Sequence, residues 1–130
     1  MNVHKIRYKD TSCFSKLVEN YTEQTIEKQL FNRYPDLSEF SEQINEKSSQ
    51  NIDRELLHSV LLKQNEILDL SHKSERNIEK IKHKNTFTIT TGHQLCTFTG
   101  PLYFIYKILS TINLTEKLQE SFPEKQFIPI

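Results

Sequence analysis

The chain has 130 residues, of which 35% are hydrophobic and 26% are charged. It carries 17 basic and 17 acidic residues, so its composition gives no broad electrostatic attraction to nucleic acid or anionic lipid. The two cysteines, Cys13 and Cys96, stand far apart without a metal-ligand spacing. They indicate neither a disulfide framework nor a metal site, and they fit a reducing cytoplasm.

Neither a signal peptide nor a membrane helix is expected. The N-terminus has no apolar signal core, so we expect a cytoplasmic protein. Residues 86–106 carry no charge and are long enough to cross a bilayer. However, this stretch holds several threonines, His93, Gln94 and a break at Gly100 and Pro101, all of which are poor choices for a lipid-facing helix.

Two helices are predicted in the first third of the chain. Over residues 12–30, apolar residues recur at three- and four-residue spacing with charges between them, which predicts an amphipathic helix. After a break at Pro35, a shorter helix is predicted over residues 37–44, capped by Asp36 or Ser38.

Two more helices complete the N-terminal part. The clearest is expected over residues 52–68 with Asp53 as its N-cap, because leucine, isoleucine and valine form a stripe opposite charged residues. A weaker helix is expected over residues 73–83, on a largely charged surface. The pattern changes abruptly after it, which predicts an N-terminal helical segment, residues 1–85, and a second part, residues 86–130.

The second part has the pattern of a βαβ unit. Residues 86–91 alternate in a β-branched pattern that predicts a strand, and the loop TGHQLCTFTGP holds both glycines of the chain. Pro101 suits the first turn of a helix, whose apolar start predicts deep packing. A second strand is predicted over residues 126–130, parallel to the first. The fold class is therefore α/β and incomplete. Two parallel strands do not form a stable sheet alone, so further strands are expected from further sequence or from a partner.

The loop between the first strand and the helix is the candidate site. In open α/β sheets, ligands bind beyond the carboxyl ends of the strands, and the start of a helix favours phosphate or carboxylate. His93 can carry a proton, and Gln94 can donate and accept hydrogen bonds. The residues alone leave open whether His93 binds a ligand or is structural. They also leave open whether Gly92 and Gly100 serve turn geometry, ligand contact or both.

The neighbouring side chains have simpler interpretations. Lys107 is expected to lay its stem along the surface with a solvated head. Tyr103 and Tyr106 are expected to pack, and Cys96 lacks a partner that would identify it as a nucleophile. The other histidines are assigned to the surface: His4, His58, His72 and His83.

The segment TFTITTGHQLCTFTGPLYFIYKILSTINL resembles the N-terminal signature of the bacillithiol biosynthesis cysteine-adding enzymes, a family of cysteine ligases. The resemblance is close over residues 86–114 and includes a threonine-rich strand, Thr-Gly-His-Gln, Phe-Thr-Gly-Pro-Leu-Tyr and Ile-Tyr-Lys. It implies a Rossmann-like core of the nucleotidylyltransferase type, with N-terminal helices before its first βαβ unit. It also implies a C-terminal coiled coil that pairs two subunits into a homodimer.

The resemblance further implies the last step of bacillithiol synthesis, in which cysteine is joined to the amino group of glucosaminyl malate. ATP is the cofactor that it suggests, no metal is expected, and the residues do not decide whether ATP activates the cysteine carboxylate directly. The implied catalytic residues, which would orient or stabilise the reacting carboxyl or phosphate group, are His93 and Gln94. The implied substrate- or nucleotide-binding residues are Gly92, Thr99 and Gly100.

Members of that family continue beyond the position of Ile130 into an acidic, histidine-containing motif that should complete the site. Residues 1–130 alone are therefore expected to be inactive. Two alternatives stay open at this point. One is another nucleotidyl-transfer enzyme of the same superfamily, and the other is a helical interaction module in which residues 1–85 bind a partner without catalysis.

Overall fold

The computed structural model describes residues 3–130. Its contacts divide the chain into two compact units, one up to Gln43 and one from Ile44 to Ile130. The predicted division into residues 1–85 and 86–130 stays a prediction. Within residues 3–130, no helix combines the length and the apolar character that a membrane span requires.

The first unit consists of short helical turns and one short helix. These elements are η1 (Tyr8–Asp10), α1 (Lys16–Thr22), η2 (Lys28–Leu30) and η3 (Leu37–Glu39). The single helix predicted over residues 12–30 is wrong in length. Ser15 caps α1 by accepting from the Val18 N–H, and the helix ends where Gln24 takes a φ of +56°. The left-handed turn lets the Gln24 and Thr25 amides bond back to the last helical turn.

An aromatic cluster joins α1 to the chain that follows η2. Tyr21 lies with its ring centroid 5.6 Å from those of Phe31 and Tyr34, and the latter two are 4.5 Å apart. The Tyr34 hydroxyl donates to the Ile26 carbonyl at 3.3 Å. Edge-to-face contacts of this kind hold short elements together without a long helix.

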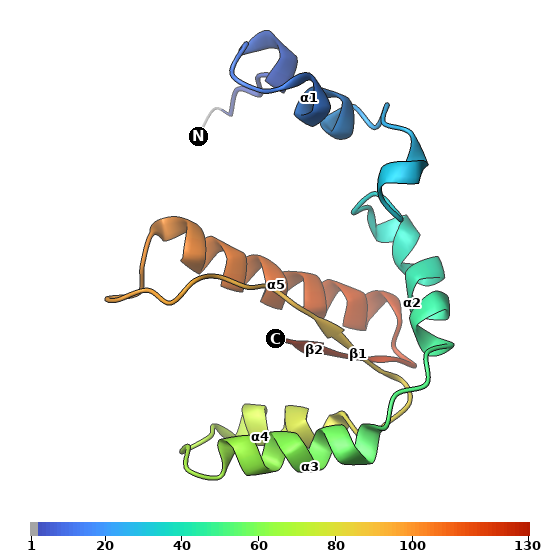
Figure 1. The fold of residues 1–130 in the computed structure, drawn as a ribbon, viewed down its shortest axis with the longest axis vertical. Coiled ribbons are helices and arrows are strands. Elements are labelled where there is room, and N and C mark those ends of the chain that lie inside the picture. The colour runs from blue at the N-terminus through green and yellow to red at the C-terminus, as the bar shows by residue number, and fades with distance from the viewer. Residues whose placement is uncertain (1–2) are drawn as a thin grey trace. The chain divides into compact units, whose positions relative to one another are not determined.

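The second unit contains the helices and strands that position the candidate site. They are α3 (Arg54–Asn65), α4 (His72–Lys80), β1 (Thr86–Ile89), α5 (Leu102–Ser121) and β2 (Gln126–Pro129), and α2 (Phe40–Ser48) crosses the division between the units. β1 and β2 pair in parallel, with Thr86 opposite Gln126 and Ile89 opposite Pro129. Figure 1 shows α5 running beside both strands. The predicted βαβ unit of an incomplete α/β fold is confirmed.

Side-chain caps set the starts of α3 and α4. Asp53 accepts from the Leu56 N–H at 2.9 Å, which confirms it as an N-cap. Ser71 accepts from the Ser74 N–H at 3.2 Å and starts α4. The predicted second helix differs at its start, because Asp36 precedes the 3-10 turn η3 without a side-chain cap bond and α2 follows at Phe40.

Arg54 joins α3 to the beginning of β1. Its guanidinium donates to the Ile81 carbonyl at 2.9 Å and to the Thr86 carbonyl at 3.1 Å. Ile81 and Thr86 are only 4% and 3% exposed, so these carbonyls have little access to water. A single planar side chain with several N–H donors can satisfy both at once.

α3 and α4 also meet through His58, whose assignment to the surface is wrong. His58 is 9% exposed, and its Nε2 lies 2.9 Å from Glu79 Oε1. Hydrogen bonds from Lys82 and then from His58 lower the pKa of Glu79 below its usual 4.5. Position 58 lies on the side of α3 that faces α4, which explains why a polar residue is buried there.

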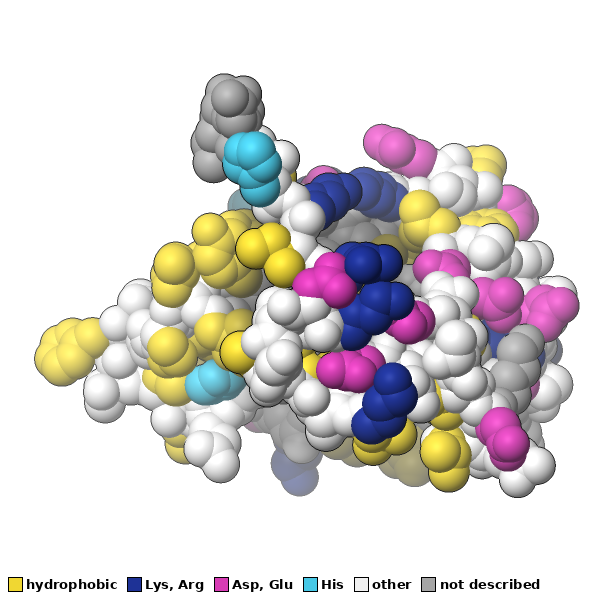
Figure 2. All heavy atoms as spheres, turned by 90° about the horizontal axis from the view of Figure 1, so that it is seen from above, with side chains coloured by type: hydrophobic (Ala, Val, Ile, Leu, Met, Phe, Trp, Pro, Cys, Tyr) yellow, Lys and Arg dark blue, Asp and Glu magenta, His cyan; other side chains and the backbone are white. Residues whose placement is uncertain are grey.

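The deep packing predicted for the start of α5 is wrong. Leu102 and Tyr103 are both 64% exposed, whereas the buried residues of α5 are Thr111, Thr115 and Leu118, from its middle onward. A helix of 20 residues spans about 30 Å, but a strand of four residues spans only about 13 Å. The two strands can therefore cover only part of the helix, and Tyr106 is exposed as well. Figure 2 shows hydrophobic side chains on one face of the surface.

The buried threonines of α5 bond within their own helix. Thr111 donates to the Lys107 carbonyl at 2.9 Å, and Thr115 donates to the Thr111 carbonyl at 2.8 Å. The Gln119 side chain instead bonds outside its own helix. Its amide donates to the Lys125 carbonyl and its oxygen accepts from the Phe127 N–H. The directional bonds between α5 and the β2 side thus lie near the C-terminal end of the helix.

The Arg54 contacts predict a local loss of stability. Replacing Arg54 with methionine keeps much of the stem but leaves the Ile81 and Thr86 carbonyls without their donor, which costs about 1–3 kcal/mol. Hydrogen exchange of the β1 amides should therefore accelerate roughly tenfold or more. Arg76→Met is the control, since Arg76 donates to the His72 carbonyl of its own helix; equal exchange rates in both variants would contradict this role.

The lowered pKa of Glu79 predicts a pH-dependent contribution to stability. A carboxylate whose pKa is depressed by folding stabilises fully above its usual value of 4.5 and loses this contribution as the pH falls through the lowered value. Glu79→Gln should be less stable than the parent at neutral pH, and the difference should vanish in acid. Urea midpoints over this range test it, with the exposed Glu116→Gln as control. A difference that persists below the lowered pKa would argue against the ion pair.

Candidate functional site

The candidate loop leaves the carboxyl end of β1, where the sequence predicts it. The strand ladder continues into the loop, because the Ile130 N–H donates to the Ile89 carbonyl at 2.9 Å and the Thr91 N–H donates to the Ile130 carbonyl at 2.8 Å. The loop therefore begins directly beyond both strand ends. This is the edge of a parallel sheet where α/β proteins bind ligands.

His93 lies in the exposed loop and faces the start of α5. Its Nδ1 is 2.9 Å from the Gln94 carbonyl and 3.3 Å from Cys96 Sγ, and its ring centroid is 5.2 Å from that of Phe104. In the tautomer with the proton on Nδ1, His93 donates to the Gln94 carbonyl and keeps a lone pair on Nε2. The imidazole is then oriented by backbone and can accept a proton or a hydrogen bond.

Gly100 closes the loop in a conformation that requires glycine. Its φ is +65°, after φ values of +50° at Phe98 and +67° at Thr99. A Cβ on Gly100 would lie 2.6 Å from the Cys96 Cβ and 2.8 Å from its Sγ. For Gly100, turn geometry is therefore sufficient reason for the glycine.

The other predicted site residues take different positions. A Cβ on Gly92 meets no heavy atom of residues 3–130 within 4 Å, its chain neighbours aside. Gln94 meets His93 through its backbone carbonyl, and the Thr99 hydroxyl donates to the Phe98 carbonyl. The structure thus brings His93 and Gln94 together, and Cys96 lies next to both His93 and Gly100. The Thr99 hydroxyl bonds only to the neighbouring Phe98 carbonyl among the described residues.

Two contacts were not foreseen from the sequence. Cys96 is the thiol beside His93, and Lys107 reaches the loop by donating to the Gly92 carbonyl. The Lys107 Nζ also lies 5.5 Å from the centroid of the Tyr103 ring, so Lys107 makes two contacts that the expectation of a solvated head did not include. The signal in the sequence was that Lys107 carries the only formal charge between residues 85 and 115.

The donor set of the loop suits a small anion. An amide side chain and the start of a helix are common ligands of carboxylate and phosphate, and an imidazole becomes one when its outward nitrogen carries a proton. In the described part of the chain, no three His, Cys, Asp or Glu side chains gather as a metal site would need. The chemistry available at the loop is thus hydrogen bonding, proton transfer and neutralisation of negative charge.

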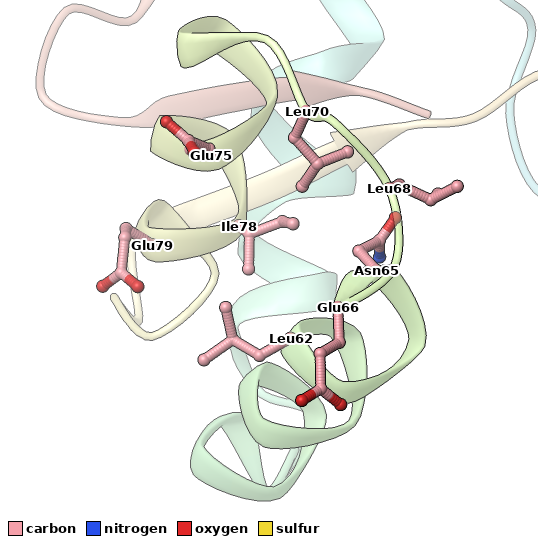
Figure 3. Close-up of a pocket in the computed structure, with 8 residues that line it drawn as sticks. All are labelled: Leu62, Asn65, Glu66, Leu68, Leu70, Glu75, Ile78 and Glu79. Atoms are coloured by element: carbon pink, nitrogen blue, oxygen red, sulfur yellow. The ribbon is translucent and has the colours of Figure 1, made fainter.

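A separate hollow lies between α3 and α4. Its volume is about 340 Å³, and its lining includes Leu62, Leu70 and Ile78. Figure 3 shows these three side chains turned toward the space between the helices, with Glu75 and Glu79 on the outer side of α4. None of its lining residues comes from the candidate loop, so we assign it no part in the loop chemistry.

Comparison with known families identifies the domain. Residues 1–130 match the model for the N-terminal Rossmann-like domain of BshC, described as a bacillithiol biosynthesis protein. The chain belongs to the BshC family. The predicted resemblance and the predicted Rossmann-like fold are thereby confirmed.

Individual relatives agree with this family. A protein of Flavobacterium johnsoniae named "Putative cysteine ligase BshC" is 47% identical over 128 residues, which cover 96% of this chain and 24% of the relative. Proteins of the same name from Flavobacterium psychrophilum and Cytophaga hutchinsonii are 44% and 42% identical, over 96% and 99% of this chain and 24% and 25% of theirs. The chain therefore spans about a quarter of the length of these relatives. The printed names describe these relatives as cysteine ligases, and the roles of the loop residues stay predictions.

The geometry at Gly100 predicts a contrast between the two glycines. Gly100→Ala should distort the loop, because alanine at positive φ costs roughly 1 kcal/mol or more and its Cβ would collide with Cys96. Gly92→Ala should leave the loop backbone in place. Chemical shifts of the amides of residues 92–100 would show large changes only in the first variant. Similar changes in both variants, or none in Gly100→Ala, would contradict this geometry.

Proposed function

We propose that the protein containing this chain is a cysteine ligase that forms the carbon–nitrogen bond of bacillithiol. It would join the carboxyl group of cysteine to the amino group of glucosaminyl malate in the last step of the synthesis. The observation that carries the proposal is the His93 loop beyond the carboxyl end of β1, in a chain of the BshC family. The names of the relatives support the cysteine ligase class.

The loop residues have separate roles in this proposal. Amide formation requires a carboxyl group held in place and an amine that loses a proton. His93 and Gln94 orient or stabilise the reacting carboxyl or phosphate group, for which His93 would donate from Nε2 in its protonated form. In the neutral ring, the lone pair on Nε2 can instead accept the proton that the amine loses. Support comes from the bond between His93 Nδ1 and the Gln94 carbonyl, which fixes the ring direction.

The remaining site residues shape the space around the anion. Gly92, Thr99 and Gly100 are the proposed binding residues, with Gly92 offering open space for close approach and Gly100 holding the turn. ATP is the proposed co-substrate, and when bound it would supply the activation that a free carboxylate lacks. The donors of the loop fit its phosphate groups by their chemistry.

Three further parts of the proposal concern the whole protein. Residues 1–130 alone are inactive, because they make up only about a quarter of the relatives' length. The intact enzyme is a homodimer paired through a C-terminal coiled coil, as the family resemblance implies. It works in the cytoplasm, where the free thiols Cys13 and Cys96 stay reduced.

The proposal predicts the effect of removing the imidazole. In the full-length protein, His93→Ala should reduce bacillithiol formation at least roughly a hundredfold, as expected for loss of a proton-transfer or orienting group, while circular dichroism stays unchanged. His72→Ala is the matched control, since the His72 imidazole is exposed and bonds to Glu75 of its own helix, away from the loop. Product measured in cells that carry each variant provides the test. Near-normal bacillithiol with His93→Ala would refute the assignment.

A further inference from the structure

Lys107 is placed where a single charge can control the candidate loop. It is the only formally charged residue between positions 85 and 115, and it lies in the second turn of α5. Its side chain is half-buried, and its Nζ donates to the Gly92 carbonyl, 15 positions earlier in the chain. The bond therefore joins the beginning of the loop to the helix that follows it.

The loop has a particular need for such a restraint at Gly92. Glycine has the widest backbone freedom of all residues, and a Cβ on Gly92 would meet open space. Packing around this residue is therefore too sparse to fix its orientation. A hydrogen bond from an ammonium group is roughly twice as strong as a neutral one, so Lys107 can supply the restraint that packing does not.

Lys107 is also connected to His93 through neighbouring groups. Lys107 Nζ lies 5.5 Å from the centroid of the Tyr103 ring, and the His93 ring centroid lies 6.3 Å from that of Tyr103. Gly92 immediately precedes His93, so the direction of its carbonyl affects the peptide plane on which His93 is carried. Lys107 thus reaches His93 both through the loop backbone and through the Tyr103 ring.

We propose that Lys107 is a positioning residue. It anchors the Gly92 carbonyl and thereby holds His93 in position beyond the carboxyl ends of β1 and β2. The inference rests on the proposed function for the role of His93, and it adds a residue that acts through another one. A competing role is direct binding of a substrate anion by the ammonium group. Anchoring acts on the rate of the chemical step, whereas direct binding acts on substrate affinity.

The test uses the full-length protein and three variants. Lys107→Met keeps the stem and removes the donor, Lys107→Arg restores a charged donor, and Lys117→Met changes an exposed lysine of the same helix. Hydrogen exchange of the amides of residues 92–95 is measured without substrate. Steady-state kinetics with cysteine and with glucosaminyl malate as the varied substrate give kcat and KM.

Anchoring predicts that Lys107→Met speeds loop exchange about tenfold and lowers kcat about 10- to 100-fold, with both KM values within about threefold of the parent. Lys107→Arg should recover most of kcat, and Lys117→Met should match the parent. Unchanged loop exchange, failure of arginine to recover kcat, or a rise in KM alone would overturn the proposal. A rise in KM for only one substrate would identify that substrate's anion as the direct partner.

The experiments distinguish a failure of the Lys107 proposal from a failure of the proposed function. If His93→Ala remains active while Lys107→Met still loosens the loop, the anchor stands and the assignment of His93 fails. If His93→Ala is inactive and Lys107→Met behaves like the parent in exchange and kinetics, the anchor fails and the proposed function stands.

Discussion

The parallel pairing of β1 with β2 determines the position of the other elements that form the site. Parallel neighbours require a crossover, so α5 must carry the chain back along the sheet, and both carboxyl ends must then lie at one edge. The bonds among Ile89, Thr91 and Ile130 extend this pairing into the loop. The burial of Phe127 and Ile128 stabilises the second strand against α5, and the loop derives its position from that contact.

The first strand and its loop are held from two directions. At the start of β1, the Arg54 guanidinium binds the carbonyls of Ile81 and Thr86. At the other end, the Lys107 ammonium binds the Gly92 carbonyl. In both places a cation on a helix binds backbone carbonyls, which suits a short strand with few side chains of its own to pack. α3 thus serves the site by fixing the entrance to the strand.

Local signals in the sequence predicted a large part of the fold. Asp53 and the apolar stripe after it identified α3, and the β-branched run with two glycines identified the strand and the loop. The left-handed turn at Gln24, just past the end of α1, carries neither glycine nor proline, so nothing local marked it. The start of α5 is apolar on nearly every side, a pattern typical of buried helices, yet its exposure depends on the length of the strands beside it. The contacts made by His58 and Lys107 join distant positions, which periodicity cannot reveal. The contact between Cys96 and His93 is local but depends on the irregular path of the loop.

The buried face of α5 has a mechanical consequence. Thr111 and Thr115 donate their hydroxyls to their own helix, so neither donor bond would break if the helix tilted slightly on the sheet. Gln119 is different, because it bonds to Lys125, just before β2, and to Phe127 in β2. The side-chain bonds from α5 to the β2 side therefore lie near the C-terminal end of the helix. A tilt of α5 would turn about that end and displace its N-terminal end, which lies beside the loop. A small rotation about Gln119 would be largest at Tyr103 and Phe104, the residues against which the His93 ring lies.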